Sequence, residues 1–150
     1  MAGINETLPL TLDSIEALIK EVGYDQFVRD EENERIMFDV KGAETLMRIQ
    51  AGIGKTPDGK PWFVRFLSYS LEFEPIRLGV EVPAMFEWIN NKNSDLLFGR
   101  YYFQADSDTV AFEVAFPCNQ GIGREDFLDM LQMATLSVDK THEGLKKLPA

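Results

Sequence analysis

Three consecutive segments whose apolar residues recur at every second position constrain the fold more than any other feature of this sequence. They lie at about 35–40, 45–53 and 62–73. Alternation of this kind is typical of half-buried β-strands. Gly42 marks the first turn between them, and residues 56–60, with a Pro and an Asp-Gly pair, mark the second. Connections this short join antiparallel neighbours, so the sequence predicts an antiparallel meander of three strands.

Two more strands and three helices complete the predicted fold. The strands lie at 98–104 and 109–116, on either side of an acidic turn. Apolar residues at helical spacing predict helices over 13–22 and 125–145, and a shorter helix begins near Pro83, a residue suited to a first helical turn. The predicted order is α-β-β-β-α-β-β-α. It indicates an α+β fold with one antiparallel five-stranded sheet, whose helices pack mainly on one face.

Some local features make the prediction sharper. Asp13 followed by Glu16 resembles a capping box, so we expect the first helix to begin there. Residues 90–94 are poor helix formers and are expected to fray into a loop. Residues 1–10 are expected to form a loose arm that docks through its two leucines. The third strand carries large apolar groups on both faces, which suits a central strand.

Length and composition limit the class of protein. With 150 residues, the chain is expected to form a single domain over 1–150. Its 25 acidic and 15 basic residues give a net charge of −10, so we expect no binding to nucleic acid or to anionic membranes. The one cysteine cannot form an internal disulfide. The sequence shows neither a signal-peptide pattern nor a membrane-spanning run, so we expect a cytoplasmic protein.

The residues that could carry chemistry do not form a recognisable reaction centre. His142 is the one histidine, and it lies close to the apolar stripe of the last predicted helix. Cys118 follows a strand end and is expected to act as a small apolar residue. Asp106-Ser107-Asp108 lacks the glycine and distal glutamate of a calcium loop. Gly121-Ile122-Gly123 lacks the rest of a phosphate-binding loop. We therefore predict no catalytic residue, metal ligand or cofactor site, and no enzymatic activity.

Aromatic residues exceed what one face of a sheet needs for its core. The chain has 11 Phe, 2 Trp and 4 Tyr. These aromatics either fill a shallow second core or form a surface for a partner or a second copy, since large exposed apolar patches are rare on monomers. The second interpretation predicts a homodimer. The residues of the candidate surface are Phe63, Leu67, Tyr69, Leu71, Phe86 and Trp88.

The order of elements and several motifs resemble the YbjN family of sensory-transduction regulators. The motifs are Phe86-Glu87-Trp88-Ile89-Asn90, Leu97-Phe98-Gly99-Arg100-Tyr101-Tyr102, Val110-Ala111-Phe112-Glu113-Val114, Phe127-Leu128 and Ser137-Val138-Asp139. The resemblance implies a bacterial regulator with the fold of type III secretion chaperones, which are small, acidic, usually dimeric proteins that bind extended segments of other proteins. It brings no catalytic residues. Where the family often has Trp followed directly by Asn, Ile89 intervenes here.

The sequence therefore leaves two functions open. The first is a non-catalytic protein-interaction module, either chaperone-like or a regulatory adaptor, that binds a protein partner through apolar surface of the sheet and helices. The alternative is a small-molecule-binding or enzymatic domain with a pocket between the sheet and the helices. The absence of clustered His, Cys or a phosphate loop in the sequence favours the first.

Overall fold

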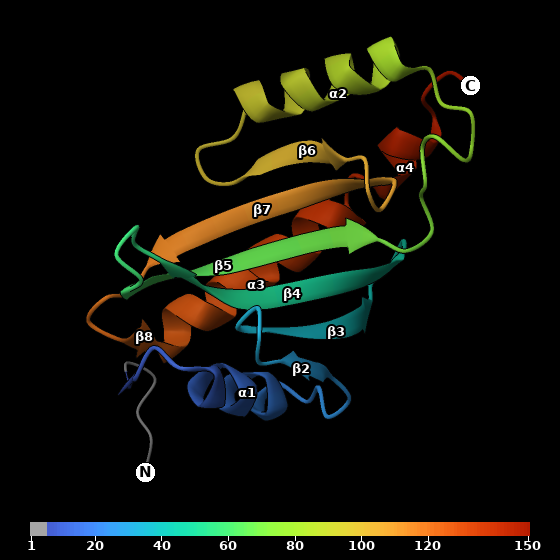
Figure 1. Cartoon of the computed structure of the whole chain (residues 1–150). Helices are drawn as coiled ribbons and strands as arrows, with labels where there is room; N and C mark the ends of the chain where they lie inside the picture. The colour runs from blue at the N-terminus through green and yellow to red at the C-terminus, as the bar shows by residue number, and fades with distance from the viewer. Residues whose placement is uncertain (1–5) are drawn as a thin grey trace.

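The computed structural model describes residues 6–150, in which a curved antiparallel sheet is covered by helices on one face (Figure 1). Within this range the main sheet has six strands, and a second sheet pairs two short ones. The strands of the main sheet, in spatial order, are β2 (Val28–Asp30), β3 (Arg35–Lys41), β4 (Leu46–Lys55), β5 (Pro61–Ser70), β7 (Thr109–Pro117) and β6 (Arg100–Gln104). The second sheet pairs β1 (Thr7–Leu8) with β8 (Ile122–Gly123).

The predicted meander is confirmed, but the predicted strand count of five is wrong. The additional strand β2 pairs over three residues with the first residues of β3. It is too short to show a period of two, and its charged sequence continues into an acidic turn, so the pattern gave no signal for it. The other limits shift by a few residues. The third predicted strand, β5, ends at Ser70, and β6 begins at Arg100 because Gly99 turns the chain with a φ of 78°.

The helices differ from prediction at their ends. They are α1 (Leu12–Glu21), α2 (Val82–Ser94), α3 (Arg124–Asp139) and α4 (His142–Lys146). The predicted capping box is wrong: Thr11 caps α1, and its hydroxyl accepts a hydrogen bond from the Ser14 N–H. The expected fraying of residues 90–94 is also wrong. The Asn93 amide bonds both the N–H and the carbonyl of Tyr101, at 2.7 and 2.9 Å, which holds the end of α2 against β6.

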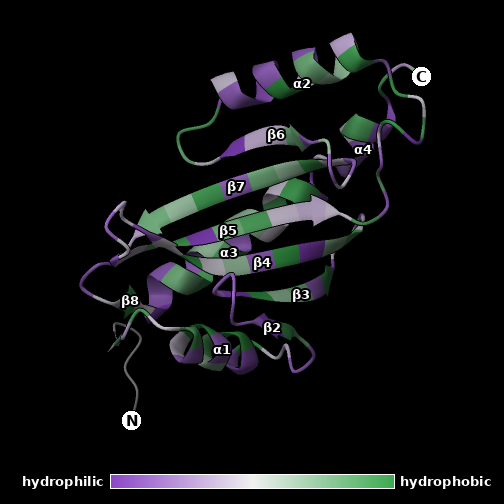
Figure 2. Ribbon diagram, in the orientation of Figure 1, coloured by the Kyte–Doolittle hydropathy of each residue, from purple (hydrophilic) through white to green (hydrophobic). Residues whose placement is uncertain are grey.

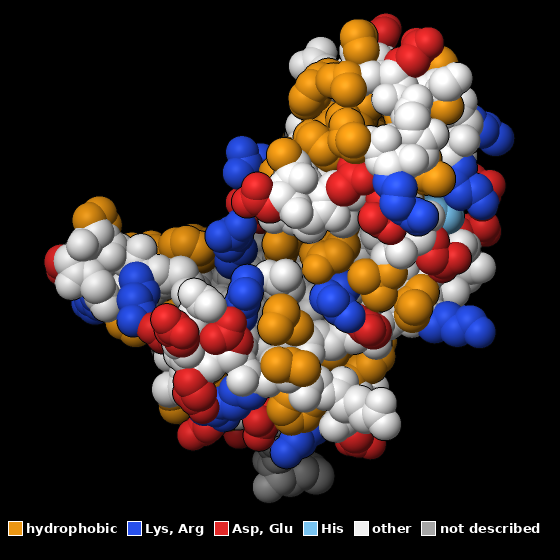
Figure 3. Space-filling view, turned by 45° about the vertical axis from the view of Figure 1, so that its right-hand side comes forward, with side chains coloured by type: hydrophobic (Ala, Val, Ile, Leu, Met, Phe, Trp, Pro, Cys, Tyr) orange, Lys and Arg blue, Asp and Glu red, His pale blue; other side chains and the backbone are white. Residues whose placement is uncertain are grey.

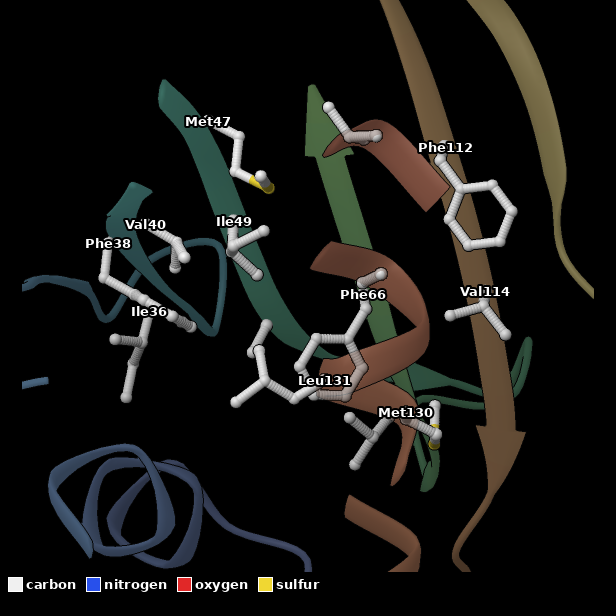
Figure 4. Close-up of a cluster of buried hydrophobic side chains, with 14 of the residues drawn as sticks. Ile36, Phe38, Val40, Met47, Ile49, Phe66, Phe112, Val114, Met130 and Leu131 are labelled. Carbon is white, nitrogen blue, oxygen red and sulfur yellow. The ribbon is translucent and has the colours of Figure 1, made fainter. Parts of the chain in front are cut away.

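The core lies between the sheet and the helices α1 and α3. Side chains from four strands and α3 converge there (Figure 4), and hydrophobic and hydrophilic residues are interleaved along the strands (Figure 2). Phe66, Phe112 and Phe127 are fully buried, and the rings of Phe66 and Phe127 lie 5.0 Å apart. The two leucines of the N-terminal arm pack against this core, as predicted; residues 1–5 of the arm lie outside the described part of the chain. Helix α2 instead runs beside the edge strand β6 (Figure 1).

The end of α3 is fixed to the turn between β3 and β4 by a buried carboxylate. Asp139 accepts hydrogen bonds from the backbone N–H groups of Ala43, Glu44 and Thr45, at 2.9, 2.8 and 3.1 Å. The turn therefore has a charged acceptor for three amide donors. The predicted helix over 125–145 is interrupted just beyond this residue, and Thr141 donates its hydroxyl hydrogen bond back to the carbonyl of Ser137.

We predict that Asp139→Ala destabilises the fold by about 3 kcal/mol or more, because three backbone donors lose a charged acceptor. The exposed Asp129 on the same helix provides the control, and Asp129→Ala should change the free energy of unfolding by less than about 0.5 kcal/mol. Urea denaturation of both variants measures the difference. Equal losses in the two variants would contradict the role given to Asp139.

His142 is buried in an environment that disfavours its charged form. The side chain is 2% exposed, and among the described residues its Nδ1 is the one buried side-chain nitrogen or oxygen without a hydrogen-bond partner. Burial lowers the pKa of His142, and the charge of Lys146 lowers it further, whereas Glu72, Glu143 and Asp139 oppose the shift. The folded state therefore holds a neutral imidazole at neutral pH.

This lowered pKa predicts a loss of stability in mild acid. The unfolded chain binds the proton of His142 below about pH 6.5, while the folded chain does not, so the contribution is present above that pH and is lost as the pH falls. The free energy of unfolding should fall by up to about 1.4 kcal/mol per pH unit in this window. Urea denaturation at about pH 7.5 and 5.5 should show a smaller fall for His142→Gln than for the wild type. An unchanged pH dependence in the variant would exclude His142 as the cause.

Candidate functional site

The face of the sheet opposite α1 and α3 is the candidate functional surface. In the described chain no helix packs across it, and strand register places its side chains in rows that cross the strands. One row joins Arg35, Gly52 and Arg65, and the next contains Gln50, Leu67, Glu113 and Arg100. The last contains Asp39, Arg48, Tyr69, Ala111 and Tyr102.

A hollow of about 900 Å³ lies on this face, and we call it the sheet-face hollow. It is open to solvent along one side, and in Figure 3 the surface is hollowed between the protruding β4–β5 hairpin and the lobe that contains α2. Lys and Arg side chains lie along this hollow in the same view. Its lining combines apolar, aromatic and guanidinium groups with amide side chains and the carboxylate of Asp106; the first three kinds include Arg35, Phe63, Arg65, Leu67, Tyr69 and Tyr102.

Glu113 connects three of the polar side chains at this surface. Its carboxylate lies 2.7 Å from Nη2 of Arg65 and 3.6 Å from Nη2 of Arg100. The Tyr102 hydroxyl donates a hydrogen bond of 3.3 Å to the same carboxylate, and the Arg100 guanidinium lies 4.9 Å from the centre of the Tyr102 ring. Burial raises the pKa of Tyr102, and the charge of Glu113 adds to the rise. The phenol is therefore protonated at neutral pH and acts as a donor.

The other two arginines of this face have carboxylate partners of their own. Arg35 donates to Asp30 and to the Gln50 side chain, both at 3.1 Å. Hydrogen bonds from Asn33, with a further contribution from Arg35, lower the pKa of Asp30. Arg48 makes two bonds to Asp39, at 2.9 and 3.3 Å. Each of these guanidinium groups is thus matched by one carboxylate.

The structure separates the six residues of the predicted partner surface into two places. Phe63, Leu67 and Tyr69 line the sheet-face hollow, although Leu67 is only 6% exposed. Leu71 lies beyond the end of β5, half-buried. The remaining two are on α2. Phe86 is 51% exposed, whereas Trp88 packs edge-on against Tyr101 with ring centres 5.3 Å apart.

The prediction from sequence omitted the charged groups of this sheet face. Arg65, Arg100 and Glu113 lie on three different strands and approach one another through strand register. Each of these three residues alternates with core residues along its strand, and this alternation could have placed all three on the outer face of the sheet. A single sequence does not state the register of one strand against the next, so the pattern could not show that one carboxylate serves two arginines.

Neither residue considered for nucleophilic or acid–base chemistry lines this hollow. His142 is buried at the start of α4, and Cys118 is buried after β7. Burial raises the pKa of the Cys118 thiol, which disfavours the reactive thiolate. Gly121, with a φ of 116°, belongs to a turn that leads into β8. Over residues 6–150, no group of three or more His, Cys, Asp or Glu side chains is placed to hold a metal ion.

No helix over residues 6–150 combines the length and the apolar character that crossing a bilayer requires.

Comparisons with known proteins identify the family. Residues 11–146 match the model of the YbjN family, described as "Putative bacterial sensory transduction regulator". The fold resembles the crystal structure of YbjN from E. coli, described as a putative transcription regulator, with a TM-score of 0.56 and 13% sequence identity over 92% of this chain and 96% of that one. At this identity the structural likeness shows the fold alone. No curated protein sequence matches. Because the family model spans nearly the whole described chain, the protein belongs to the YbjN family.

Proposed function

We propose that this protein is a non-catalytic interaction module, a regulatory or chaperone-like adaptor that binds an extended segment of a partner protein in the sheet-face hollow. The observation that carries the proposal is the sheet face that no helix within residues 6–150 covers, which holds a hollow of about 900 Å³. A sheet normally buries both faces or presents a polar face to water. Here aromatic and aliphatic side chains, including Phe63 and Tyr69, remain accessible beside arginines.

The composition of the hollow favours binding over catalysis. Interfaces are enriched in Tyr and Arg, and both residues occur here. The chain's one histidine and one cysteine lie elsewhere, so the lining offers neither an imidazole base nor a thiol nucleophile. The family description as a regulator supports the same interpretation.

A small-molecule site is the alternative function. The volume of the hollow falls within the range of ligand pockets, about 300–1,000 Å³. The alternative placed its pocket between sheet and helices, but that space is filled by the core. An open hollow on the outer face buries less of a small ligand than such sites usually do. A polypeptide segment can make contacts along its whole length.

Site-specific photo-crosslinking tests the proposal. A photoreactive phenylalanine analogue at Tyr102 places the reactive group in the hollow, whereas the same analogue at the exposed Ala17 of α1 places it on the opposite side of the molecule. We expect irradiation in the native cell to join a partner polypeptide to the Tyr102 variant and not to the Ala17 variant. Mass spectrometry identifies the joined segment.

Equal crosslinking at both positions would contradict a specific site in the hollow. Absence of protein adducts at Tyr102, together with retention of a small molecule by the native protein, would favour the alternative function. Far-ultraviolet circular dichroism of the two variants checks that both remain folded.

We also propose that the protein self-associates through apolar side chains around α2. Phe86 and Val82 are exposed on this helix, and Leu97 and Phe98 are exposed in the loop that follows it, Leu97 at 93%. Phe86 also lies edge-on to Phe103 of β6, at 6.4 Å between ring centres. A twofold interface would cover this patch on both copies without leaving an open surface. The net charge of −10 on each copy opposes association.

Sedimentation at micromolar concentration measures this association. We expect a dimer that tightens as salt rises toward physiological values, because ions screen the repulsion between the two acidic chains. The double variant Phe86→Ser, Leu97→Ser should shift the species toward the 17.1 kDa monomer. The control is Val28→Ser, an exposed apolar residue on β2 at the other end of the sheet. A wild-type monomer at every salt concentration would exclude the dimer.

The surroundings proposed for this module follow from its charge and composition. We place it in the cytoplasm of a bacterium, where a single reduced cysteine is ordinary. A chain with ten excess negative charges is repelled by nucleic acids and by anionic lipids, so we propose a protein as its macromolecular partner.

A further inference from the structure

We propose that the bound partner segment is acidic, and that one of its carboxylates binds between Arg65 and Arg100. This inference rests on the proposed function and specifies the chemistry of the partner. It is carried by a local imbalance of charge on the sheet face beside the hollow, which Arg65 lines: the guanidinium groups of Arg65 and Arg100 share the single carboxylate of Glu113, at 2.7 and 3.6 Å.

The imbalance is specific to this pair of arginines. Arg48 on the same face has the two oxygens of Asp39 to itself, and Arg35 has Asp30. The Tyr102 hydroxyl also donates to the Glu113 carboxylate, at Oε2, the oxygen that lies nearest Arg65. One positive charge is therefore left in excess among these groups, on the surface of a chain whose net charge is −10.

The chemistry of arginine favours a carboxylate as the missing partner. A guanidinium group has five donors in a rigid plane and binds carboxylates through two parallel hydrogen bonds. Arg100 lies against the ring of Tyr102 and its side chain is 63% exposed, so its guanidinium group is accessible to an incoming acceptor. A carboxylate that reaches this point would give each arginine a full counter-charge.

The surroundings favour an extended segment with acidic residues at alternate positions. Gly52 lies between Arg35 and Arg65 in the same row and adds no side chain to the floor there. The backbones of Arg35 and Arg65 are two strand spacings apart, about 10 Å. Alternate side chains of an extended peptide lie on one side, about 7 Å apart. Arg35 uses Nε for Asp30 and Nη1 for Gln50, so a second carboxylate can approach its Nη2 although its charge is already matched. The residues between them would face away from the sheet.

Three peptides that differ in one residue type test this proposal. Each is a fluorescein-labelled 12-residue peptide in which every second position, about 7 Å apart, is Glu, Gln or Lys, with Leu and Tyr between. Fluorescence anisotropy at about 0.15 M salt measures their affinities for the full chain. We expect the Glu peptide to bind about tenfold more tightly than the Gln peptide, and the Lys peptide to bind most weakly.

Variants of the two arginines and of Glu113 should change this affinity in opposite directions. Arg65→Gln and Arg100→Gln should each weaken binding of the Glu peptide about tenfold, whereas Glu113→Gln should strengthen it, because the competing carboxylate is removed. Arg48→Gln is the matched control, since Arg48 lies on the same face with its own partner. We expect it to leave the affinity unchanged. A general loss of folding would weaken binding in every variant. It therefore cannot account for weaker binding by Arg65→Gln together with stronger binding by Glu113→Gln.

Four results would overturn the proposal that the partner segment is acidic. Three concern the peptides: equal binding of the Glu and Gln peptides, preference for the Lys peptide, or no binding up to roughly millimolar concentration. The fourth is tighter binding of a labelled oligothymidylate than of the Glu peptide. Retained protein crosslinks at Tyr102 alongside the first three results would leave the proposed binding site intact and reject only its acidic partner. Loss of those crosslinks would reject the proposed function itself.

Discussion

The buried carboxylate of Asp139 fixes the relation between α3 and the sheet on which the rest of the structure depends. It accepts three backbone N–H groups from the β3–β4 turn, residues nearly a hundred positions earlier in the chain. Two further polar contacts act along the same helix: Ser68 of β5 donates to the carbonyl of Ala134, and Tyr101 of β6 donates to that of Ser137. Buried polar groups fix the orientation of the elements that carry them, because each group loses the free energy of a hydrogen bond if it does not meet its partner. These contacts hold α3 in one orientation over strands from β3 to β6.

This arrangement makes the two faces of the sheet different in kind. The face under α1 and α3 holds the fully buried residues, such as Phe66 and Phe112. The opposite face keeps arginines and tyrosines within reach of solvent, because they alternate with those core residues along the same strands. The residues that build the core thus also determine which side chains line the hollow. A shift of one residue in the register of β5 would exchange Phe66 for Arg65 and lose both surfaces.

Features that depend on residues close together in the sequence could be predicted from it, whereas features that depend on distant residues could not. Period-two segments and a Pro-Asp-Gly turn are local, so they correctly indicated the meander of β3, β4 and β5. Strand β2 has three residues and gains its pairing from β3, so nothing in its own sequence marked it. Asn93 likewise ends a helix because Tyr101 offers it two backbone groups, and local propensity favoured a loop there. The proximity of Arg65 and Arg100 depends on β7 lying between their strands, which no local pattern states.

The net negative charge of the chain and the positive charge of the Arg65–Arg100 pair act over different distances. Ten net charges spread over the whole molecule repel an acidic segment while it approaches, but at physiological ionic strength this repulsion decays over about 8 Å. A carboxylate in contact with Arg65 and Arg100 is within hydrogen-bond range, at separations well below this screening length. Acidic polymers with high charge density, which feel the long-range field most strongly, are therefore disfavoured. A segment with a few carboxylates spaced by apolar residues has the lower barrier to approach and keeps the full contact at the two arginines.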